Sequence, residues 1–289
     1  MRLVTWNVLH GRTMGDAHVD ADRFADAVRA LDADVLALQE VDRGQPRSDS
    51  IDLTALAAEA MGGASACFVP TLIGDPARSW RPADNRDLDA VADGYGIALL
   101  SRYPVQRWHV LRLAPGGARR MPPVDPETGM AHRLSEEPRA AVAATIRSPL
   151  GVFTIVCTHL SFVPGSNIRQ LRRVMRWMHG LPGPRILMGD LNLPHTVVRR
   201  LTRAHALAHG ATFPVMQPMV QIDHILSPDP LPPVRQIRLA RPPLSDHLPL
   251  AVELGRGAVH RRGRQWEHAT ADGADTEGAS STAGAGWES

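Results

Sequence analysis

Eight polar residues that can bind a metal or move a proton stand at, or just outside, the ends of short apolar runs. They are Asn7, Glu40, His159, Asp190, Asn192, Asp223, Asp246 and His247. Six of them carry carboxylate or amide oxygens, two are histidines, and none is a cysteine. Hard oxygen donors without a thiolate partner suit Mg²⁺ or Mn²⁺ rather than zinc. Because one fold can bring the ends of several strands to one rim of a sheet, we expect these side chains to form a single site.

The two histidines of this set remain free for proton transfer or for hydrogen bonds to a phosphate. An imidazole that moves a proton needs a partner that holds its tautomer and stabilises its charged form, and Asp223 is a candidate for that role. Taken alone, each histidine is more often structural. The interpretation therefore depends on the whole set.

The central stretch of the pattern is a short apolar run, 186–188, followed by Gly189 and two potential ligands. The run predicts a buried strand that ends at Asp190. If the backbone stays extended, Asp190 and Asn192 face the same side. Pro194 suits the first turn of a helix, with Asn192 as a candidate cap. The alternative is that this stretch is only a turn with a cap.

The elements that must position these residues are predicted from hydrophobic periodicity. Strands are expected at 3–8, 34–40, 66–69, 95–101, 105–113, 139–146, 152–158, 186–188, 222–226, 234–239 and 248–254. Helices are expected at 20–31, 51–61, 167–178 and 196–207. Loops are expected at 73–93 and 114–137. The segments 139–146 and 152–158 form a predicted hairpin, which indicates antiparallel sheet, and the arginines of 167–178 are interpreted as a solvated helix face.

Composition places the chain among ordinary globular proteins with a large core. Of its 289 residues 44% are hydrophobic and 21% are charged, and the formal net charge of +2 gives no electrostatic argument for nucleic acid. We expect one domain over 1–254 and a disordered tail over 255–289, which is rich in Gly, Ala, Ser and Thr. No pattern indicates an oligomer, so a monomer is expected.

The cysteines and the N-terminal segment indicate the cellular compartment that we expect for the protein. The two cysteines, Cys67 and Cys157, lie in apolar stretches and are expected to be buried free thiols, which fits a reducing compartment. Met1 is followed at once by a predicted strand, which leaves no room for a signal peptide, and no segment has transmembrane length. If Met1 is the true start, a cytoplasmic protein is expected.

Seven short motifs occur in a fixed order. They are Thr5-Trp6-Asn7, Leu38-Gln39-Glu40-Val41, Gly94-Tyr95-Gly96-Ile97-Ala98-Leu99-Leu100-Ser101, Thr158-His159-Leu160, Gly189-Asp190-Leu191-Asn192, Ile222-Asp223-His224 and Ser245-Asp246-His247-Leu248-Pro249. Together they resemble the endonuclease/exonuclease/phosphatase superfamily with its deoxyribonuclease-I-like fold, over about residues 1–254. The resemblance implies an α/β four-layer sandwich of two packed mixed β-sheets flanked by helices, with the site at one end.

The resemblance also implies a metal-dependent phosphohydrolase using Mg²⁺ or Mn²⁺. By this analogy Glu40 is the main metal ligand, with Asn7 and Asp246 close to the metal. Asp190 and Asn192 would position the attacking water and a phosphate oxygen. Asp223 would pair with His247, and His159 would act on the phosphate or the leaving group. The residues that carry these roles are Asn7, Glu40, His159, Asp190, Asn192, Asp223, Asp246 and His247.

The substrate stays open at this point. Nucleic acid is the first expectation, and a small molecule or a lipid headgroup, such as a phosphoinositide or a sphingomyelin-like diester, is the second. A catalytically inactive binding module is a third alternative. His159 stands where abasic-site endonucleases of the superfamily usually carry a tyrosine, which disfavours that branch. Arg43 and Arg139 are candidate phosphate contacts, with surface ion pairs as the alternative.

Overall fold

The structure is a computed structural model that describes residues 1–15, 18–76, 78–88, 93–115 and 136–255. Contacts divide the chain into Met1–Gly257 and Ala258–Ser289, and the description below concerns the first unit. The predicted tail and nearly all of the predicted loop 114–137 lie outside the described residues.

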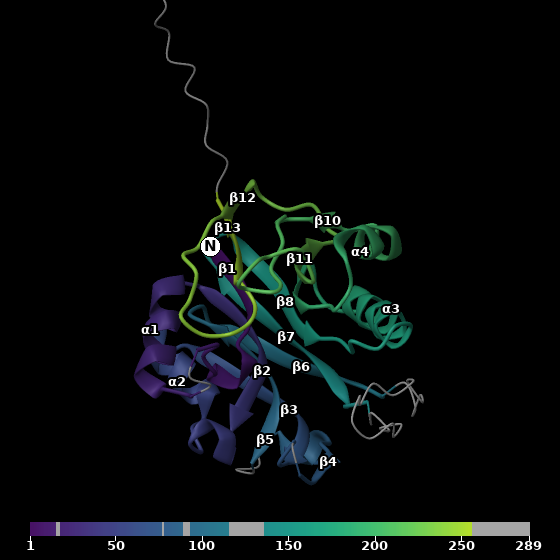
Figure 1. The fold of residues 1–289 in the computed structure, drawn as a ribbon. Helices are drawn as coiled ribbons and strands as arrows, with labels where there is room; N and C mark the ends of the chain where they lie inside the picture. Colours follow the sequence, from purple (N-terminus) through teal and green to yellow (C-terminus); the bar gives the residue numbers. More distant parts are fainter. Residues whose placement is uncertain (16–17, 77, 89–92, 116–135, 256–289) are drawn as a thin grey trace, which may run out of the picture. The chain divides into compact units, whose positions relative to one another are not determined.

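Two mixed β-sheets form the centre of the unit (Figure 1). The first sheet has, in spatial order, β12 (Val234–Ile237), β13 (Leu250–Leu254), β1 (Arg2–Asn7), β2 (Val35–Arg43), β5 (Gly94–Ser101), β3 (Ser65–Gly74) and β4 (Trp80–Pro82). The second has β10 (His205–Ala206), β11 (Asp223–Ser227), β9 (Arg185–Asp190), β8 (Gly151–His159), β7 (Arg139–Ser148) and β6 (Val105–Leu113). The pairs β1–β2 and β8–β9 are parallel, and the other pairs are antiparallel.

Four helices cover the outer faces of the sheets. They are α1 (Ala21–Leu31), α2 (Leu53–Ala60), α3 (Ser166–His179) and α4 (His195–Thr202). Figure 1 shows α1 and α2 on one side of the sheets and α3 and α4 on the other. The predicted four-layer order of helices, sheet, sheet and helices is confirmed. The predicted hairpin is also confirmed, as β7 and β8.

Successive side chains of each strand point to opposite faces of its sheet, and the buried ones form three apolar layers. In β1, Leu3 packs between the two sheets, whereas Val4 and Trp6 pack beneath α1 and α2. Leu171 and Met178 of α3 pack in the same way on the outer face of the second sheet. Each fully buried large side chain stabilises the fold by about 1.5–3 kcal/mol, so both sheets are held firmly on two faces.

Strand register brings the predicted site residues to one rim. In the second sheet, Asp190 at the end of β9 lies opposite His159 on one side and opposite Asp223 on the other. In the first sheet, Asn7 at the end of β1 lies opposite Gln39, next to Glu40. Three neighbouring strands of one sheet and two of the other therefore meet at this rim.

Several predicted boundaries were wrong. β2 does not end at Glu40 but continues to Arg43, and the register shifts between Gln39 and Val41 so that Glu40 stands in a bulge. The predicted loop 73–93 contains β4 and a short 3₁₀ turn at Asn85–Asp87. Helix α4 ends at Thr202 because Arg203 adopts the left-handed conformation.

The predicted extension through Asn192 was also wrong. β9 ends at Asp190, and Asn192 has a positive φ of 50°. Asn192 is not a helix cap either, since Pro194 occupies the N-cap position of α4 without a side-chain hydrogen bond. The side chains of Asp190 and Asn192 still reach the same cleft, because the turned backbone lets the Asn192 N–H donate to Asp190 Oδ1 at 2.9 Å.

Candidate active site

Asn7 joins the two sheets at the rim. Its Nδ2 donates to Glu40 Oε1 at 2.9 Å and to Asp190 Oδ2 at 3.2 Å. Its Oδ1 accepts from the backbone N–H of Leu9 at 3.1 Å, which fixes the orientation of the amide. One buried amide therefore links a carboxylate of the first sheet to a carboxylate of the second.

Glu40 points into the site because of its bulge. Its φ of 56° is in the left-handed region, and no residue of β5 pairs with it. A bulge of this kind re-aims one side chain and is frequent beside functional sites. Burial raises the pKa of Glu40, and the nearby Asp246 carboxylate raises it further. Within the described residues Glu40 forms no ion pair, and the charges of Arg139 and His247 offset only part of the rise in its pKa.

His247 forms a buried dyad with Asp223. Its Nδ1 lies 2.8 Å from Asp223 Oδ2, and its Nε2 faces Asp190 Oδ2 at 3.8 Å. Burial opposes the charged imidazole, but the carboxylates, Asp223 foremost, raise the pKa of His247 to about 9. His247 is therefore an imidazolium at neutral pH.

The backbone around this dyad is held by its neighbours. Ser245 Oγ donates to the carbonyl of Asn7 at 2.6 Å and accepts from the N–H of His247 at 3.0 Å. Trp6 Nε1 donates to the carbonyl of His247 at 3.2 Å. The ring of Phe213 packs on the imidazole, with centroids 4.9 Å apart. The sequence analysis did not identify Ser245 or Phe213 as parts of the site, although Ser245 stands in a quoted motif.

Asp190 occupies the centre of the group. It is almost fully buried, and burial together with the charge of Asp223 raises its pKa above the usual range of a carboxyl group. It faces both histidines, with Oδ2 at 3.6 Å from His159 Nε2. A carboxylate with a raised pKa between two imidazoles is suited to exchange protons near neutral pH.

His159 is neutral and is oriented by Arg139. Burial, followed by the positive charge of Arg139, lowers the pKa of His159 well below its ordinary value. Arg139 Nη1 lies 3.2 Å from His159 Nδ1. A guanidinium can only donate, so Nδ1 accepts and Nε2 carries the hydrogen. That N–H points toward Asp190 and toward the cleft.

The two arginines predicted as phosphate contacts differ in position. Arg139 is buried, lines the cleft and pairs with Glu137 at 3.3 Å. Arg43 lies elsewhere: it pairs with Asp52 at 3.1 Å and stacks on Phe68 at 4.3 Å. The bulge at Glu40 and the continuation of β2 turn Arg43 away from the cleft, so the structure does not bring it to the site.

These groups open into a cleft of about 380 Å³. It is lined by His10, Glu40, Arg47, Pro76, Tyr95, Glu137, Arg139, His159, Phe162, Asp190, Asn192, Phe213, Ile222 and His247. Asn7, Asp223 and Asp246 adjoin it through their contacts with Glu40 and His247. All eight residues singled out at the strand ends thus form one contiguous network.

The network contains residues that fit a cation. Asp190, Asp223 and His247 each offer one ligand atom, and these atoms lie within 4.8 Å of one another. However, the Nδ1 of His247 is engaged by Asp223, and an imidazolium has no lone pair to offer. The carboxylates of Glu40 and Asp246 fit better, because Asp246 Oδ1 is buried without a hydrogen-bond partner among the described residues. Oxygen donors of this type suit a hard divalent cation. Asn7 presents its nitrogen to Glu40 and so positions that carboxylate.

The sequence model of the endonuclease/exonuclease/phosphatase family matches residues 4–247. The chain belongs to the endonuclease/exonuclease/phosphatase family. Members of this family are phosphoric ester hydrolases that generally use a divalent metal. The match includes every strand-end residue of the network.

Similar proteins in other organisms do not identify the substrate of this family member. The chain is 26% identical to the uncharacterized protein YbhP of Escherichia coli K12 over 276 residues, covering 88% of this chain and 95% of YbhP. It resembles the mannosyl-6-phosphatase of Bacteroides thetaiotaomicron, with 17% identity, a TM-score of 0.56 and coverage of 88% and 98%. It resembles sphingomyelinase C of Streptomyces griseocarneus, with 14% identity, a TM-score of 0.54 and coverage of 88% and 99%. At these identities the two structures support the fold alone.

Proposed function

We propose that this family member is a metal-dependent phosphodiester hydrolase that cleaves nucleic acid. The observation that carries the proposal is the arrangement of Asp190 in one cleft. It lies between the charged His247 on one side and the neutral His159 on the other, and Asn7 connects it to Glu40. Phosphoryl transfer needs positive charge and hydrogen-bond donors around the phosphate and a base beside the water, and this cleft contains both.

Glu40 and Asp246 would hold Mg²⁺ or Mn²⁺, and Asn7 would position Glu40 through its Nδ2. When bound, such a cation stabilises negative charge on the phosphate oxygens. It would also offset the burial and the nearby Asp246 charge that together raise the pKa of Glu40.

Asp190 is the better candidate for the base that activates water. The sequence left Asp190 and His247 as alternatives, but His247 is already protonated at neutral pH because Asp223 stabilises its charge. His247 then stabilises the charge that develops on the phosphate. Asn192 restrains the carboxylate of Asp190 through its backbone N–H.

His159 and Arg139 act on the phosphate or the leaving oxygen. Arg139 holds His159 with Nδ1 as acceptor, so that the Nε2 hydrogen is available to a phosphate oxygen. Asn192 Nδ2 donates to the carbonyl of Leu160 at 3.0 Å. It also lies 3.3 Å from His159 Nε2, and because both nitrogens carry hydrogen in this tautomer, that contact packs against the imidazole without a hydrogen bond. Arg139 and His159 together therefore present the Nε2 hydrogen of His159 in a fixed direction.

The proposal is tested with plasmid DNA and bis-p-nitrophenyl phosphate, each in Mg²⁺, Mn²⁺ or EDTA. We expect the wild type to cleave both substrates only with a divalent cation, and His247→Asn to lose several orders of magnitude in rate. Cleavage of the small diester without nicking of DNA would remove nucleic acid as the substrate while keeping the chemistry. Wild-type rates in His247→Asn would overturn the site itself.

An amphiphilic phosphodiester, such as a lipid headgroup, is the second candidate, and a specific observation favours it. Phe162, which lines the cleft, is 51% exposed, and Met216 and Met219 are 71% and 72% exposed. Met219 is hydrogen-bonded through its backbone to Phe213, another residue of the cleft. Exposed apolar side chains at a cleft rim suit an apolar part of a ligand. Hydrolysis of sphingomyelin or a phosphoinositide in detergent micelles, with DNA left intact, would select this candidate.

A further inference from the structure

The outer faces of α3 and α4 carry seven exposed arginines. They are Arg169, Arg172, Arg173 and Arg176 of α3, and Arg199, Arg200 and Arg203 of α4 and its C-cap. In the part of the chain that the structure describes, none of these seven forms an ion pair with a carboxylate. We call this group the arginine face.

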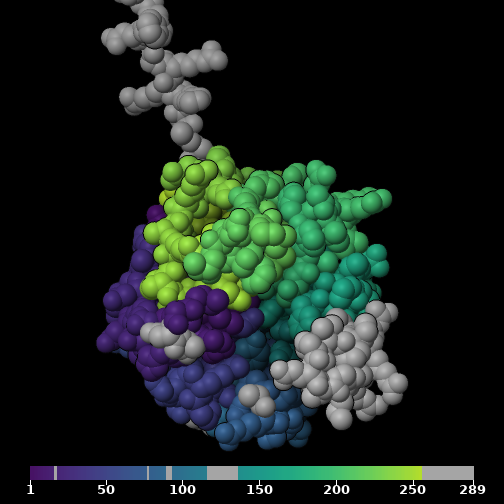
Figure 2. Space-filling model, in the orientation of Figure 1, coloured from purple at the N-terminus to yellow at the C-terminus, as the bar shows by residue number. Residues whose placement is uncertain are grey.

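The charge around the arginine face is strongly one-sided. From residue 138 to residue 222 the sequence has ten arginines and one carboxylate, Asp190, which is buried in the active site. Just before this stretch, Glu136 accepts from Ser166 at the start of α3 and Glu137 pairs with Arg139, so the acid lies at the cleft end of the helix. The remaining residues carry the excess of acid that brings the formal net charge of the chain down to +2. In Figure 2 this teal and green part of the chain makes up one side of the unit's surface. The near-neutral total therefore conceals a basic face, which a solvated helix with balanced charges would not show.

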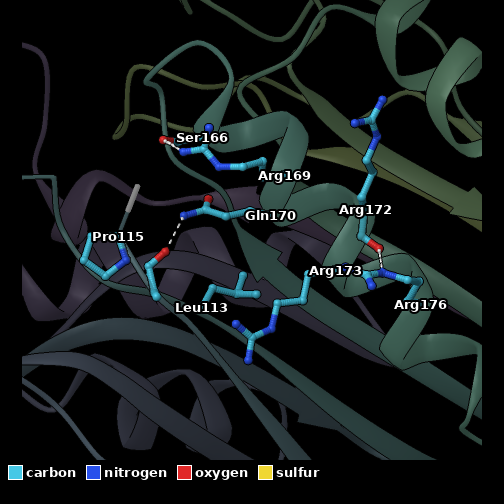
Figure 3. Close-up of a pocket in the computed structure, with 9 residues that line it drawn as sticks. Leu113, Pro115, Ser166, Arg169, Gln170, Arg172, Arg173 and Arg176 are labelled. Atoms are coloured by element: carbon cyan, nitrogen blue, oxygen red, sulfur yellow. Dashed lines mark hydrogen bonds between the residues drawn. The ribbon is translucent and has the colours of Figure 1, made fainter. Parts of the chain in front are cut away.

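The arginines of α3 lie along one stripe of the helix. Their spacing of three, one and three residues places them on a single face, and the stripe is ~10 Å long at a rise of about 1.5 Å per residue. Together with Leu113 and Pro115 they border a hollow of about 590 Å³ (Figure 3). A groove between α3 and α4 is lined by Arg172 and Arg176 as well, so the arginines of α3 border two adjoining depressions.

The stripe begins next to the active site. Asn167, in the first turn of α3, donates through Nδ2 to the carbonyl of Asn192 at 3.0 Å. From there the helix runs outward with Arg169 first and Arg176 last. A chain molecule with one phosphate in the cleft can therefore extend along α3 and meet one arginine after another.

The chemistry of this face favours a nucleic-acid backbone over a membrane. A helix that lies on a bilayer places large apolar side chains beside its basic ones. In α3 these side chains, such as Leu171 and Val174, are buried against the sheet. Among the described residues, the large apolar side chains that are exposed lie outside α3 and α4. The exposed guanidinium groups stand in a row, and the apolar residues beside them, such as Leu113 and Leu171, are buried, which matches a series of phosphates better than a bilayer.

We propose that the arginine face binds the phosphate backbone of a nucleic-acid strand whose scissile phosphate lies in the cleft. This inference rests on the proposed function and deepens it, since it names the part of the substrate that is held outside the catalytic centre. The four arginines of α3 make the nearer contacts, and those of α4 extend the track.

The test is the binding of a fluorescein-labelled oligonucleotide, single-stranded or duplex, measured by fluorescence anisotropy in EDTA so that no metal-dependent cleavage occurs. Arg172→Gln/Arg173→Gln is compared with the matched pair Arg107→Gln/Arg238→Gln, two exposed arginines on β6 and just after β12. We expect the α3 pair to weaken binding about tenfold near 0.1 M salt and to lower the slope of log K against log salt by nearly one per arginine. The control pair should bind within about twofold of the wild type, because single distant charges act weakly at this ionic strength.

Equal binding by the two double variants would overturn the proposal, as would a wild type that binds neither oligonucleotide. It would also be overturned if the α3 pair lost binding to phosphatidylglycerol vesicles while the wild type ignored nucleic acid. Hydrolysis of bis-p-nitrophenyl phosphate distinguishes a failure of this binding proposal from a failure of the proposed catalytic function. Both double variants should keep the wild-type rate on that diester, because none of the four arginines lines the cleft.

Discussion

His247 is the residue whose chemistry depends most on its neighbours. Burial alone would keep it neutral, and the carboxylate of Asp223 at 2.8 Å reverses this. His159 shows the opposite case: burial first and the charge of Arg139 second lower its pKa, and its carboxylate neighbour Asp190 lies farther away, at 3.6 Å. The two buried histidines therefore differ in protonation because His247 has a carboxylate within hydrogen-bond distance, whereas His159 faces a guanidinium.

We expect Asp223→Asn to lower the rate of diester cleavage at least about a hundredfold, since the imidazolium loses its stabilising partner. The loss should appear in kcat more than in KM, because Asp223 acts through His247 and does not line the cleft. Steady-state kinetics measure this, with Asp22→Asn, an exposed carboxylate in the first turn of α1, as the control. A change in KM alone would assign Asp223 to substrate binding instead.

Asp87 provides a pH-dependent test of stability away from the site. The bidentate hydrogen bonds from Arg81, followed by the backbone N–H of Asp84, lower the pKa of Asp87 to about 2. A carboxyl group with a lowered folded-state pKa stabilises the fold above its unfolded value, and this is lost as the pH falls through the folded value. Urea midpoints of wild type and Asp87→Asn should therefore converge between about pH 4 and pH 2. A difference that stayed constant over this window would contradict the assignment.

At the scale of elements, the parallel pairing of β8 and β9 sets His159 opposite Asp190. This pairing depends on Gly189, which has a φ of 143° and whose added Cβ would lie 1.9 Å from the carbonyl oxygen of Thr158. No side chain fits at that distance, so only glycine allows the two strands to approach.

Gly189→Ala should therefore destabilise the protein by more than about 2 kcal/mol, from the strained φ and the clash together. The expected result is a large drop in the urea midpoint, and for any folded fraction a loss of cleavage through displaced Asp190. Gly180→Ala is the control, because Gly180 has no positive φ and its added Cβ would lie 3.4 Å from its nearest neighbour. Similar urea midpoints for Gly189→Ala and Gly180→Ala would show that β8 and β9 can move apart without loss of stability, which would contradict this prediction.

The elements also show where sequence reasoning reaches its limit. Apolar runs and polar ends predicted the strands that carry Asn7, His159, Asp190 and Asp223, because burial on both faces leaves a clear pattern. The bulge at Glu40 left no such pattern, since a left-handed glutamate has no local sequence signal. Arg43 was consequently assigned to the phosphate, whereas the extra strand residues turn it toward Asp52.

At the scale of the whole molecule, the ordered motifs predicted the family and the four-layer architecture correctly. Phe213 could not be found in advance, because its contact with His247 joins segments 34 residues apart through a loop without periodicity. The arginines of 167–178 were interpreted from the sequence as a solvated helix face. The binding role that we propose for them depends on the arrangement of the elements, because the formal net charge of +2 sums over the whole chain and does not show that one side is basic.

Within the described residues, every helix is too short or too polar to cross a bilayer. Two sheets share one rim in the folded unit. Asn7 of the first sheet contacts Asp190 of the second, so the site exists only when both sheets are packed together.

The central claim is that Glu40 belongs to a cation-dependent catalytic site. The most direct measurement is the rate of bis-p-nitrophenyl phosphate hydrolysis by EDTA-treated wild type, Glu40→Gln and Glu59→Gln as Mg²⁺ is added back, where Glu59 is an exposed glutamate on α2. We predict that Mg²⁺ restores the wild type and Glu59→Gln equally and leaves Glu40→Gln lower by about a thousandfold or more. Full activity of the wild type in EDTA, or a wild-type rate in Glu40→Gln, would contradict the account.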